Sequence, residues 1–350
     1  IIALTCLKPF MRLIQVPESI FEQAHAYIFV ILAGMVSSMC YNMCAGIMRA
    51  LGNSLTPLYF LIFSSVVNLS CDCLFVIVFR WGVQGAAIAT VVAQTFSAIL
   101  AVIYLLKKYK DYLPEKRHFR QSKEVFEEMT ASGLSMAAMY CVVDLGSIVY
   151  SRAVNGLGEL YITAQTSSRK LIEMCMMPFE SLSSANSTFV SQNYGAKKFD
   201  RIRKCIKSVS VLEVIYGASM FVVIFFFGGE IVRLLTNTSD ALVIANATLS
   251  MNIHFGCYPA LGILLELRTT MQALKYKAIP IISSLIEFVG KIVSGFALIP
   301  VFGYTAVCLT EPALWILMAA FLLIAFAVVK PIKKAEIYER GEQNNIEIKI

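Results

Sequence analysis

The chain has 350 residues, of which 58% are hydrophobic and 15% are charged, and its formal net charge is +7. Soluble domains carry about 25% charged residues, so this composition excludes an ordinary soluble protein and favours a polytopic membrane protein. The basic excess does not indicate a nucleic-acid partner, because Lys and Arg fall in alternate loops between apolar runs.

Apolar runs long enough to cross a bilayer follow one another along the chain after an opening segment that resembles the end of an earlier span. We expect each run to be a helix, since a backbone in lipid must satisfy its own hydrogen bonds, and the fold class is therefore all-α. Nine spans are predicted, at 20–48, 57–79, 82–106, 127–152, 160–190, 208–228, 242–267, 279–300 and 304–329.

Lys and Arg set the orientation. They are concentrated at 107–123, 197–207, 268–277 and beyond 330, and are sparse in the alternate loops. The positive-inside rule places the rich set in the cytoplasm. Residues 107–125 are predicted to be a cytoplasmic linker between an N-terminal lobe of residues 1–106 and a C-terminal lobe of residues 126–330. Residues 331–350 are predicted to be a cytoplasmic tail.

An internal repeat relates the two lobes. Met48-Arg49-Ala50-Leu51 recurs 223 residues later as Met271-Gln272-Ala273-Leu274, and Pro57 recurs as Pro280. Each copy holds three spans in the same orientation, which is typical of parallel repeats about an axis normal to the membrane. Three further spans precede the second copy. We therefore expect about three spans upstream of Ile1, and a twelve-helix, two-lobe transporter of which this chain is an N-terminally truncated part.

One acid lies inside the second predicted span. Asp72 is seven residues before Phe79, and Thr90 is eight residues after Gly82, so both lie roughly 10–12 Å from the same membrane face. Asn68 shares the helix face of Asp72. A charged group at this depth must be paired, protonated or bound to a cation. Asn68, Asp72 and Thr90 are predicted to bind Na⁺ or H⁺; the alternative is a structural hydrogen-bond network between helices.

Charged residues also lie inside spans of the second half. Glu287 and Lys291 are one helical turn apart, and Lys291 occupies the repeat position of Asn68, so a built-in ammonium stands where the first lobe is predicted to hold a cation. Asp144 and Arg169 have matched depths and are predicted to pair; Glu173 lies one turn from Arg169. These residues are candidates for a charge network or for substrate contact. Glu266 and Arg268 are interpreted as structural residues at a cytoplasmic helix end.

No sequence pattern indicates a cofactor or an enzyme. The ten Cys residues lie mostly inside apolar runs without a CxxC pair, and the three His residues are scattered, so no metal site is predicted beyond Na⁺ at Asp72. No HExxH, GxSxG, P-loop or dinucleotide motif is present, which makes ATP an unexpected energy source.

The sequence resembles the multidrug and toxic compound extrusion (MATE) antiporters. The resemblance is carried by the segments 46–57 (GIMRALGNSLTP), 81–87 (WGVQGAA), Pro178 with 192–196 (QNYGA), 268–274 (RTTMQAL) and Glu311-Pro312. It implies two six-helix lobes, with this chain beginning near the end of the third helix. In family members with a cation site in the first lobe, Asn, Asp and Thr of the fifth and sixth helices bind the ion, which here are Asn68, Asp72 and Thr90. An Asp on the first helix completes that site in the family.

These observations predict a secondary antiporter that exports organic cations or amphiphilic drugs in exchange for Na⁺ or H⁺ by alternating access. We expect a monomeric, multi-pass protein of the bacterial plasma membrane, in contact with membrane lipid. One alternative is a lipid-linked sugar flippase of the same architecture, which would need an Arg-rich cavity for the pyrophosphate. The other is a truncated remnant that does not transport.

Overall fold

A computed structural model describes residues 2–13, 18–112, 123–236 and 240–337. The described residues are helical and contain no strand, which confirms the predicted all-α class. The chain forms two compact units, Ile1–Gln121 and Ser122–Ile350. Of the predicted linker 107–125, residues 113–122 lie outside the described residues, as do residues 338–350 of the predicted tail.

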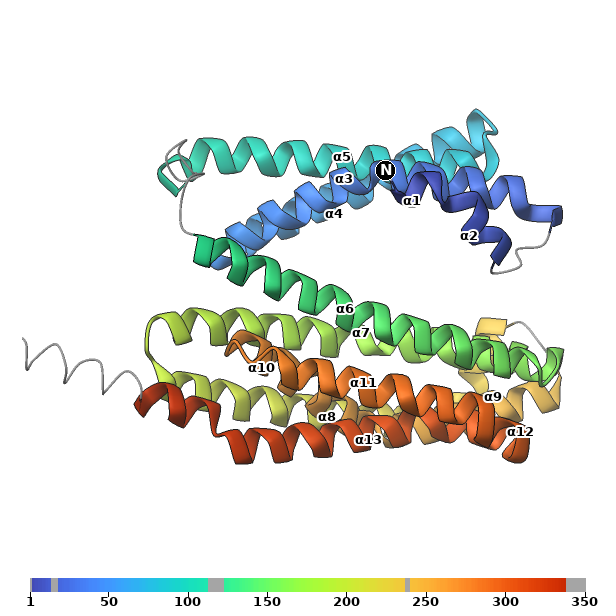
Figure 1. Ribbon diagram of the computed structural model, residues 1–350. Coiled ribbons are helices and arrows are strands. Elements are labelled where there is room, and N and C mark those ends of the chain that lie inside the picture. Colours follow the sequence, from blue (N-terminus) through green and yellow to red (C-terminus); the bar gives the residue numbers. More distant parts are fainter. Residues whose placement is uncertain (1, 14–17, 113–122, 237–239, 338–350) are drawn as a thin grey trace, which may run out of the picture. The chain divides into compact units, whose positions relative to one another are not determined.

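The N-terminal unit is built around α5, which packs along both α3 and α4 (Figure 1). Its elements are α1 Ile2–Thr5, α2 Leu7–Leu13, α3 Glu18–Ala50, α4 Leu55–Asp72, the π-helix η1 Cys73–Val78, α5 Gly82–Lys108 and the 3₁₀ turn η2 Lys110–Tyr112. Small buried side chains dominate the contact face of α5: Gly85, Ala87, Ala89, Ala93, Ser97, Ala98 and Ala101. Small residues allow helices in a membrane to approach closely.

Helix α3 approaches α5 closely at Gly34. A Cβ added there would lie 2.3 Å from Val91 Cγ2 and 2.6 Å from Val91 Cγ1. Val91 is β-branched, so its side chain has little freedom to move aside within a helix. Gly34→Ala is therefore expected to destabilise the protein by about 1–3 kcal/mol through overpacking.

Gly46 supplies the matched control for that substitution, since it lies on the same helix and a Cβ there meets nothing within 4 Å. Gly46→Ala is expected to gain up to about 1 kcal/mol from helix propensity. Thermal unfolding of the two purified variants in detergent measures the difference. Equal midpoints for the two variants would show that the approach at Gly34 is not tight.

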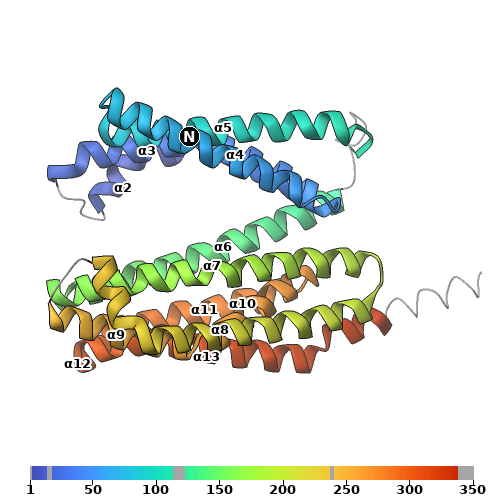
Figure 2. The ribbon, with the colours of Figure 1, turned by 180° about the vertical axis from the view of Figure 1, so that it is seen from behind.

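The C-terminal unit packs longer helices around an aromatic and aliphatic core. Its elements are α6 Lys123–Asn155, α7 Glu159–Gly195, α8 Phe199–Thr236, α9 Ala241–Gly256, α10 Tyr258–Ala273, α11 Ala278–Val293, the π-helix η4 Ser294–Leu298, α12 Ile299–Phe302 and α13 Tyr304–Val329. Helices α7 and α8 run side by side, and α10 contacts both of them and α13 (Figure 2). The largest fully buried side chains of this core include Tyr150, Phe179, Phe255, Tyr258 and Met318.

Seven helices within the described residues are long and apolar enough to cross a membrane. Helix α7, which corresponds to the predicted span 160–190, is not one of these seven helices because polar residues are frequent along it. The span predicted at 242–267 is wrong as a single helix: it is divided into α9 and α10 at Cys257. Pro259 lies in the first turn of α10 and lacks the N–H that would continue the hydrogen-bond ladder of α9. By contrast, Pro178 and Pro312 lie within continuous helices.

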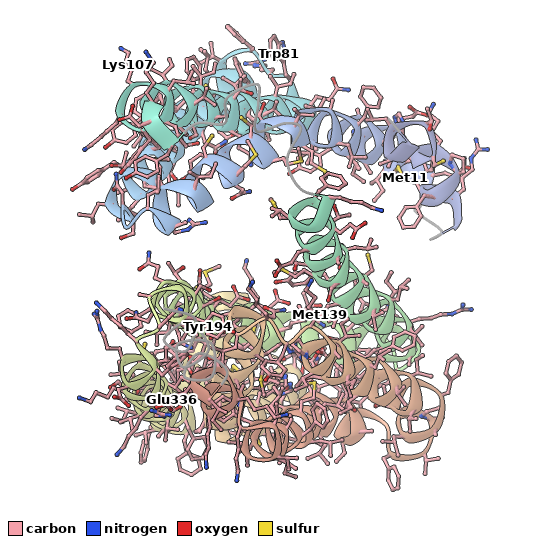
Figure 3. The ribbon with its side chains drawn as sticks, turned by 60° about the vertical axis from the view of Figure 1, so that its left-hand side comes forward. Met11, Trp81, Lys107, Met139, Tyr194 and Glu336 are labelled. Carbon is pink, nitrogen blue, oxygen red and sulfur yellow. The ribbon has the colours of Figure 1, made fainter. Side chains whose placement is uncertain are left out.

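The loops predicted to be cytoplasmic meet at one end of the C-terminal unit. Residues near the ends of α7, α8 and α10 form a small apolar cluster there with Ile332. Residues 331–337 are helical, and Glu336 pairs with Arg203 of α8 over 2.5 Å, so the first part of the predicted tail packs on the unit. Tyr194 and Glu336 lie on the same side of this unit (Figure 3). Lys275 pairs with Glu128 over 2.9 Å, and this carboxylate raises the pKa of Lys275.

The internal repeat is visible in the backbone of both units. The amide of Asn53 donates to Met48 O over 2.8 Å, and the amide of Tyr276, 223 residues later, donates to Met271 O over 2.9 Å. The residue before each donor adopts positive φ, Gly52 at 85° and Lys275 at 68°. The two turns are thus the same C-terminal helix cap, formed at equivalent points of the repeat.

Candidate functional site

Asn68 of α4 and Thr90 of α5 are in contact. Nδ2 of Asn68 donates to Oγ1 of Thr90 over 3.5 Å, and both side chains are half-buried. The Thr90 hydroxyl itself donates to Ala86 O over 3.1 Å, within its own helix. The side-chain oxygen of Asn68 and a lone pair of Thr90 are therefore available to a further partner.

Asp72 ends α4, one helical turn after Asn68. Its side chain is half-buried, yet its Oδ1 is inaccessible and has no hydrogen-bond partner among the described residues. An unpartnered buried oxygen costs about 1–3 kcal/mol, and more when it carries charge. A proton or a cation at this oxygen would remove that cost, and the oxygens of Asn68 and Thr90 are of the hard type that Na⁺ prefers. These residues fit a site for a monovalent cation.

The helix changes from α to π directly after Asp72. Cys73–Val78 is a π-helix, in which each backbone amide donates to the carbonyl five residues before it. The Phe79 amide, for example, donates to Leu74 O over 2.9 Å. Such segments often lie at functional sites. The second unit has its own π segment at the corresponding point, Ser294–Leu298. The π segment is therefore a property of the repeat and does not by itself mark a cation site.

Lys291 of the second unit occupies the repeat position of Asn68, and it is 5% exposed. Its ammonium lies 2.9 Å from Ser147 Oγ, 3.0 Å from Glu287 Oε1 and 3.8 Å from Glu311 Oε1. Glu311 follows Gly303 by eight residues, as Thr90 follows Gly82. The Asn68–Thr90 contact of the first unit is thus replaced by a Lys291–Glu311 contact in the second. The Lys291 ammonium supplies the positive charge there.

Glu311 is the centre of a charge network. Besides Lys291, it lies 3.9 Å from Arg169 Nη1 and 3.7 Å from His254 Nε2, and its side chain is 13% exposed. Because ion pairs in a low-dielectric interior are strong but costly to desolvate, a carboxylate with three such neighbours is held in place by all of them.

The network extends outward from Glu311 in two directions. On one side Arg169 Nε donates to Glu173 Oε1 over 2.7 Å. On the other, Lys291 leads to Glu287, whose second oxygen lies 3.6 Å from Arg268 Nη2. Carboxylates and cations alternate along this chain, three of each, so the network is electrically balanced when His254 is neutral. It joins four of the five predicted charge-network residues: Arg169, Glu173, Glu287 and Lys291.

Asp144, the fifth candidate, is not part of the network. Its side chain is exposed, and Arg169 pairs with Glu173 and Glu311 in place of the predicted Asp144. Glu266 and Arg268 are interpreted from the sequence as structural residues whose charges snorkel to the cytoplasmic end of their helix, and the snorkelling is wrong. Glu266 is 0% exposed, and the Arg268 side chain is 12% exposed because both face neighbouring helices rather than the membrane surface.

Sequence reasoning missed three members of the network: His254, Arg268 and Glu311. The spacing of Glu311 from Gly303 could have identified it, since the same spacing identified Thr90. His254 and Arg268 are separated by the break at Cys257, and no periodicity in a continuous helix relates them.

A cavity of about 390 Å³ lies beside the network. Residues of α6 and α7 line it, among them Tyr150, Asn155, Gln165, Arg169, Lys170 and Glu173. This volume lies within the range of small-molecule pockets, roughly 300–1,000 Å³. Aromatic, amide and charged groups therefore surround a space that a small amphiphile could occupy.

Comparison with known proteins decides the family. The family model described as MatE matches residues 1–74 and 135–297, which is more than half of the chain. This chain belongs to the MatE family. The resemblance inferred from the sequence motifs is thereby confirmed, and with the apolar helices it makes the chain a multi-pass membrane protein.

The MatE chain is similar to curated bacterial proteins over most of its own length. It is 27% identical to the "probable multidrug resistance protein YpnP" of Bacillus subtilis over 280 residues, 79% of this chain and 62% of the relative. It is 26% identical to "probable multidrug resistance protein YoeA" of the same organism, covering 69% of this chain and 54% of the relative. The chain thus spans less than two thirds of the length of these relatives.

Solved structures of MATE transporters share the fold of this MatE chain. A crystal structure of a MATE in the bent conformation matches with a TM-score of 0.84 at 18% identity, covering 96% of this chain and 75% of that one. The Vibrio cholerae MATE transporter VcmN in the bent form matches with a TM-score of 0.83 at 19% identity, covering 96% and 76%.

Proposed function

We propose that this MatE-family chain works in a secondary active antiporter that exports organic cations or amphiphilic drugs in exchange for inward Na⁺ or H⁺. The observation that carries the proposal is the buried, unpartnered Oδ1 of Asp72, one helical turn along α4 from the Asn68 that contacts Thr90. Both relatives are named probable multidrug resistance proteins, which supports the substrate class. The transporter operates as a monomer by alternating access of its two lobes.

The coupling ion binds at Asp72. The ion or proton neutralises the carboxylate, whose charged form is costly in the membrane interior. Asn68 and Thr90 supply oxygen ligands from α4 and α5, so ion binding links these two helices. Release of the ion leaves the carboxylate charged and favours a state of the lobe in which water reaches it. The free-energy difference between these states couples the ion gradient to export.

The cavity beside Arg169 is proposed to receive the organic substrate. Glu173 lines it with an exposed carboxylate that pairs with Arg169. A cationic substrate can compete with Arg169 for this carboxylate, because Arg169 retains Glu311 as a second partner. The cavity therefore offers a negative group to a cation without leaving an unpaired guanidinium behind.

Glu173→Gln is expected to weaken transport of cationic substrates about tenfold, equivalent to roughly 1.4 kcal/mol of binding free energy, while Tm falls little. Exposed ion pairs contribute about 0–1 kcal/mol to stability. Efflux of a cationic dye and thermal unfolding of the same variant are the two measurements. Glu180→Gln, an exposed acid on the same helix, is the control. Equal losses of transport and stability in Glu173→Gln would assign the residue to the structural network alone.

The charges near the cavity favour this substrate class over an anionic lipid-linked sugar. A flippase would need cations free to bind pyrophosphate. Arg169 is already paired with two carboxylates, and Lys291 with Glu287 and Glu311. Among the described residues that line the cavity, this leaves the exposed Lys170 as a single ammonium, which is fewer cations than a pyrophosphate needs. The balance of charge therefore supports an exporter of cations or amphiphiles.

Drug efflux from cells expressing the full-length protein, with and without a Na⁺ gradient and a pH gradient, tests the proposed function. We expect efflux that depends on one of the two gradients. Lack of efflux under every gradient, from protein correctly inserted in the membrane, would favour the non-transporting remnant. Translocation of a lipid-linked sugar in place of drugs would favour the flippase.

A further inference from the structure

Two acids that are not members of the Glu311 network are buried in the C-terminal unit. Glu213 of α8 and Glu266 of α10 are each 0% exposed. The two helices pack directly on one another. Gly262, one turn before Glu266, approaches so closely that a Cβ added there would lie 2.8 Å from Glu213 Cβ. Glu213 therefore packs on the α10 face that carries Glu266, and the two carboxyl groups interact electrostatically.

Each carboxyl group has one hydroxyl partner and one oxygen left over. Ser183 Oγ donates to Glu213 Oε1 over 3.3 Å, and Ser210 Oγ donates to Glu266 Oε2 over 2.5 Å. The remaining oxygens, Glu213 Oε2 and Glu266 Oε1, are inaccessible and have no hydrogen-bond partner among the described residues. Each of the two acids therefore has a buried acceptor that still needs a donor.

Within the described part of the C-terminal unit, the residues around this pair do not supply a balancing positive charge. Arg268 is two residues from Glu266 on α10 and is directed to Glu287 and Ser283 of α11. Helix α7 contributes Ser183 and Asn186, and Asn186 is engaged with Thr270 and with the Cys205 thiol. Of the described residues, Cys205 is a further titratable group that interacts electrostatically with Glu266. Two ionised carboxylates in this setting would repel one another without solvent or a cation to compensate.

We propose that Glu213 and Glu266 form a proton-binding dyad in the C-terminal unit, a site separate from Asp72. One proton, taken from water by either carboxylate, forms an O–H bond on Glu213 Oε2 or Glu266 Oε1 and is donated to the other oxygen. Two adjacent acids share a proton for this reason in other proteins, and the pair then titrates as a unit. The dyad gives both unpartnered oxygens a partner and removes one negative charge from the membrane interior.

Infrared difference spectroscopy of the full-length protein in lipid nanodiscs tests the dyad without reference to transport, so its outcome is independent of the proposed antiport. Wild-type protein at neutral pH is expected to show a protonated-carboxyl C=O band that shifts in D₂O. Glu213→Gln and Glu266→Gln should each change this band, and the double variant should remove the component that they change while leaving any contribution from a protonated Asp72. Glu180→Gln, at an exposed position on α7, should leave it unchanged.

Two results would overturn the proposal. One is a spectrum in which the carboxyl band is the same in wild type and in both Gln variants. The other is a band that is absent in Na⁺ buffer and appears when choline replaces Na⁺, which would mean that the pair binds Na⁺. Correct folding of each Gln variant is verified by its elution as a single species, and Glu→Asp at the same positions should retain the band at a shifted frequency.

Discussion

Asp72→Asn is expected to abolish ion-driven efflux while leaving the protein folded and inserted. Asn has nearly the shape of Asp and can still hydrogen-bond, but it cannot carry the negative charge that a proton or Na⁺ neutralises. Among the described residues of the N-terminal unit, Asp72 is the acid that has an unpartnered buried oxygen, so we expect no other described acid to replace it there. Gradient-driven drug transport in proteoliposomes should fall by at least about tenfold, which corresponds to roughly 1.4 kcal/mol of lost coupling.

Asp111→Asn provides the matched control, because it is the same chemical change at an exposed position of the same unit. It should transport at the wild-type rate. Thr90→Val and Asn68→Leu should each weaken the dependence on the ion without abolishing transport, because each removes one oxygen. Ion-driven transport by Asp72→Asn at the rate of the Asp111→Asn control would refute the assignment of Asp72.

Glu311→Gln is expected to cause the largest loss of stability, about 3–5 kcal/mol, because it removes a buried charge on which three side chains converge. Arg169, Lys291 and His254 all lie within 4 Å of this carboxylate. Chemical unfolding of the purified protein measures the loss. Glu230→Gln, which breaks an exposed pair with Arg233, should cost no more than about 1 kcal/mol.

A double variant tests whether Glu311 stabilises the protein through its interaction with Lys291. Lys291→Met together with Glu311→Gln removes two opposite charges that lie 3.8 Å apart. Their combined cost should be smaller than the sum of the single costs, because the second substitution removes a charge that the first left uncompensated. Strictly additive costs would show that Lys291 and Glu311 do not stabilise one another.

The repeat and the membrane spans were the features most accessible from sequence, because both depend on patterns with a fixed period or offset. The offset of 223 residues that relates Pro57 to Pro280 also relates the turns at Gly52 and Lys275. The depth of Asp72 and Thr90 followed from a rise of about 1.5 Å per residue along each helix. Residues at similar depth on neighbouring antiparallel helices can meet, and Asn68 and Thr90 are in contact.

Contacts between helices that are distant in the chain were less accessible. Hydropathy placed Glu266 near a span end and therefore at the membrane surface, but α8 covers it and leaves it fully buried. Asp144 and Arg169 were matched in depth, yet depth does not fix which face of a helix a residue occupies. Arg169 of α7 faces Glu311 of α13. This ion pair joins helices that are more than 100 residues apart in the chain, so it depends on how the helices pack.

Direct cation binding to the purified full-length protein is the measurement that bears most closely on Asp72. Equilibrium binding of radioactive Na⁺, together with the protons released or taken up, should show one site in the wild type that Asp72→Asn removes and Asp111→Asn retains. Binding of the same stoichiometry and affinity in Asp72→Asn would contradict the account, and the coupling ion would then have to bind elsewhere.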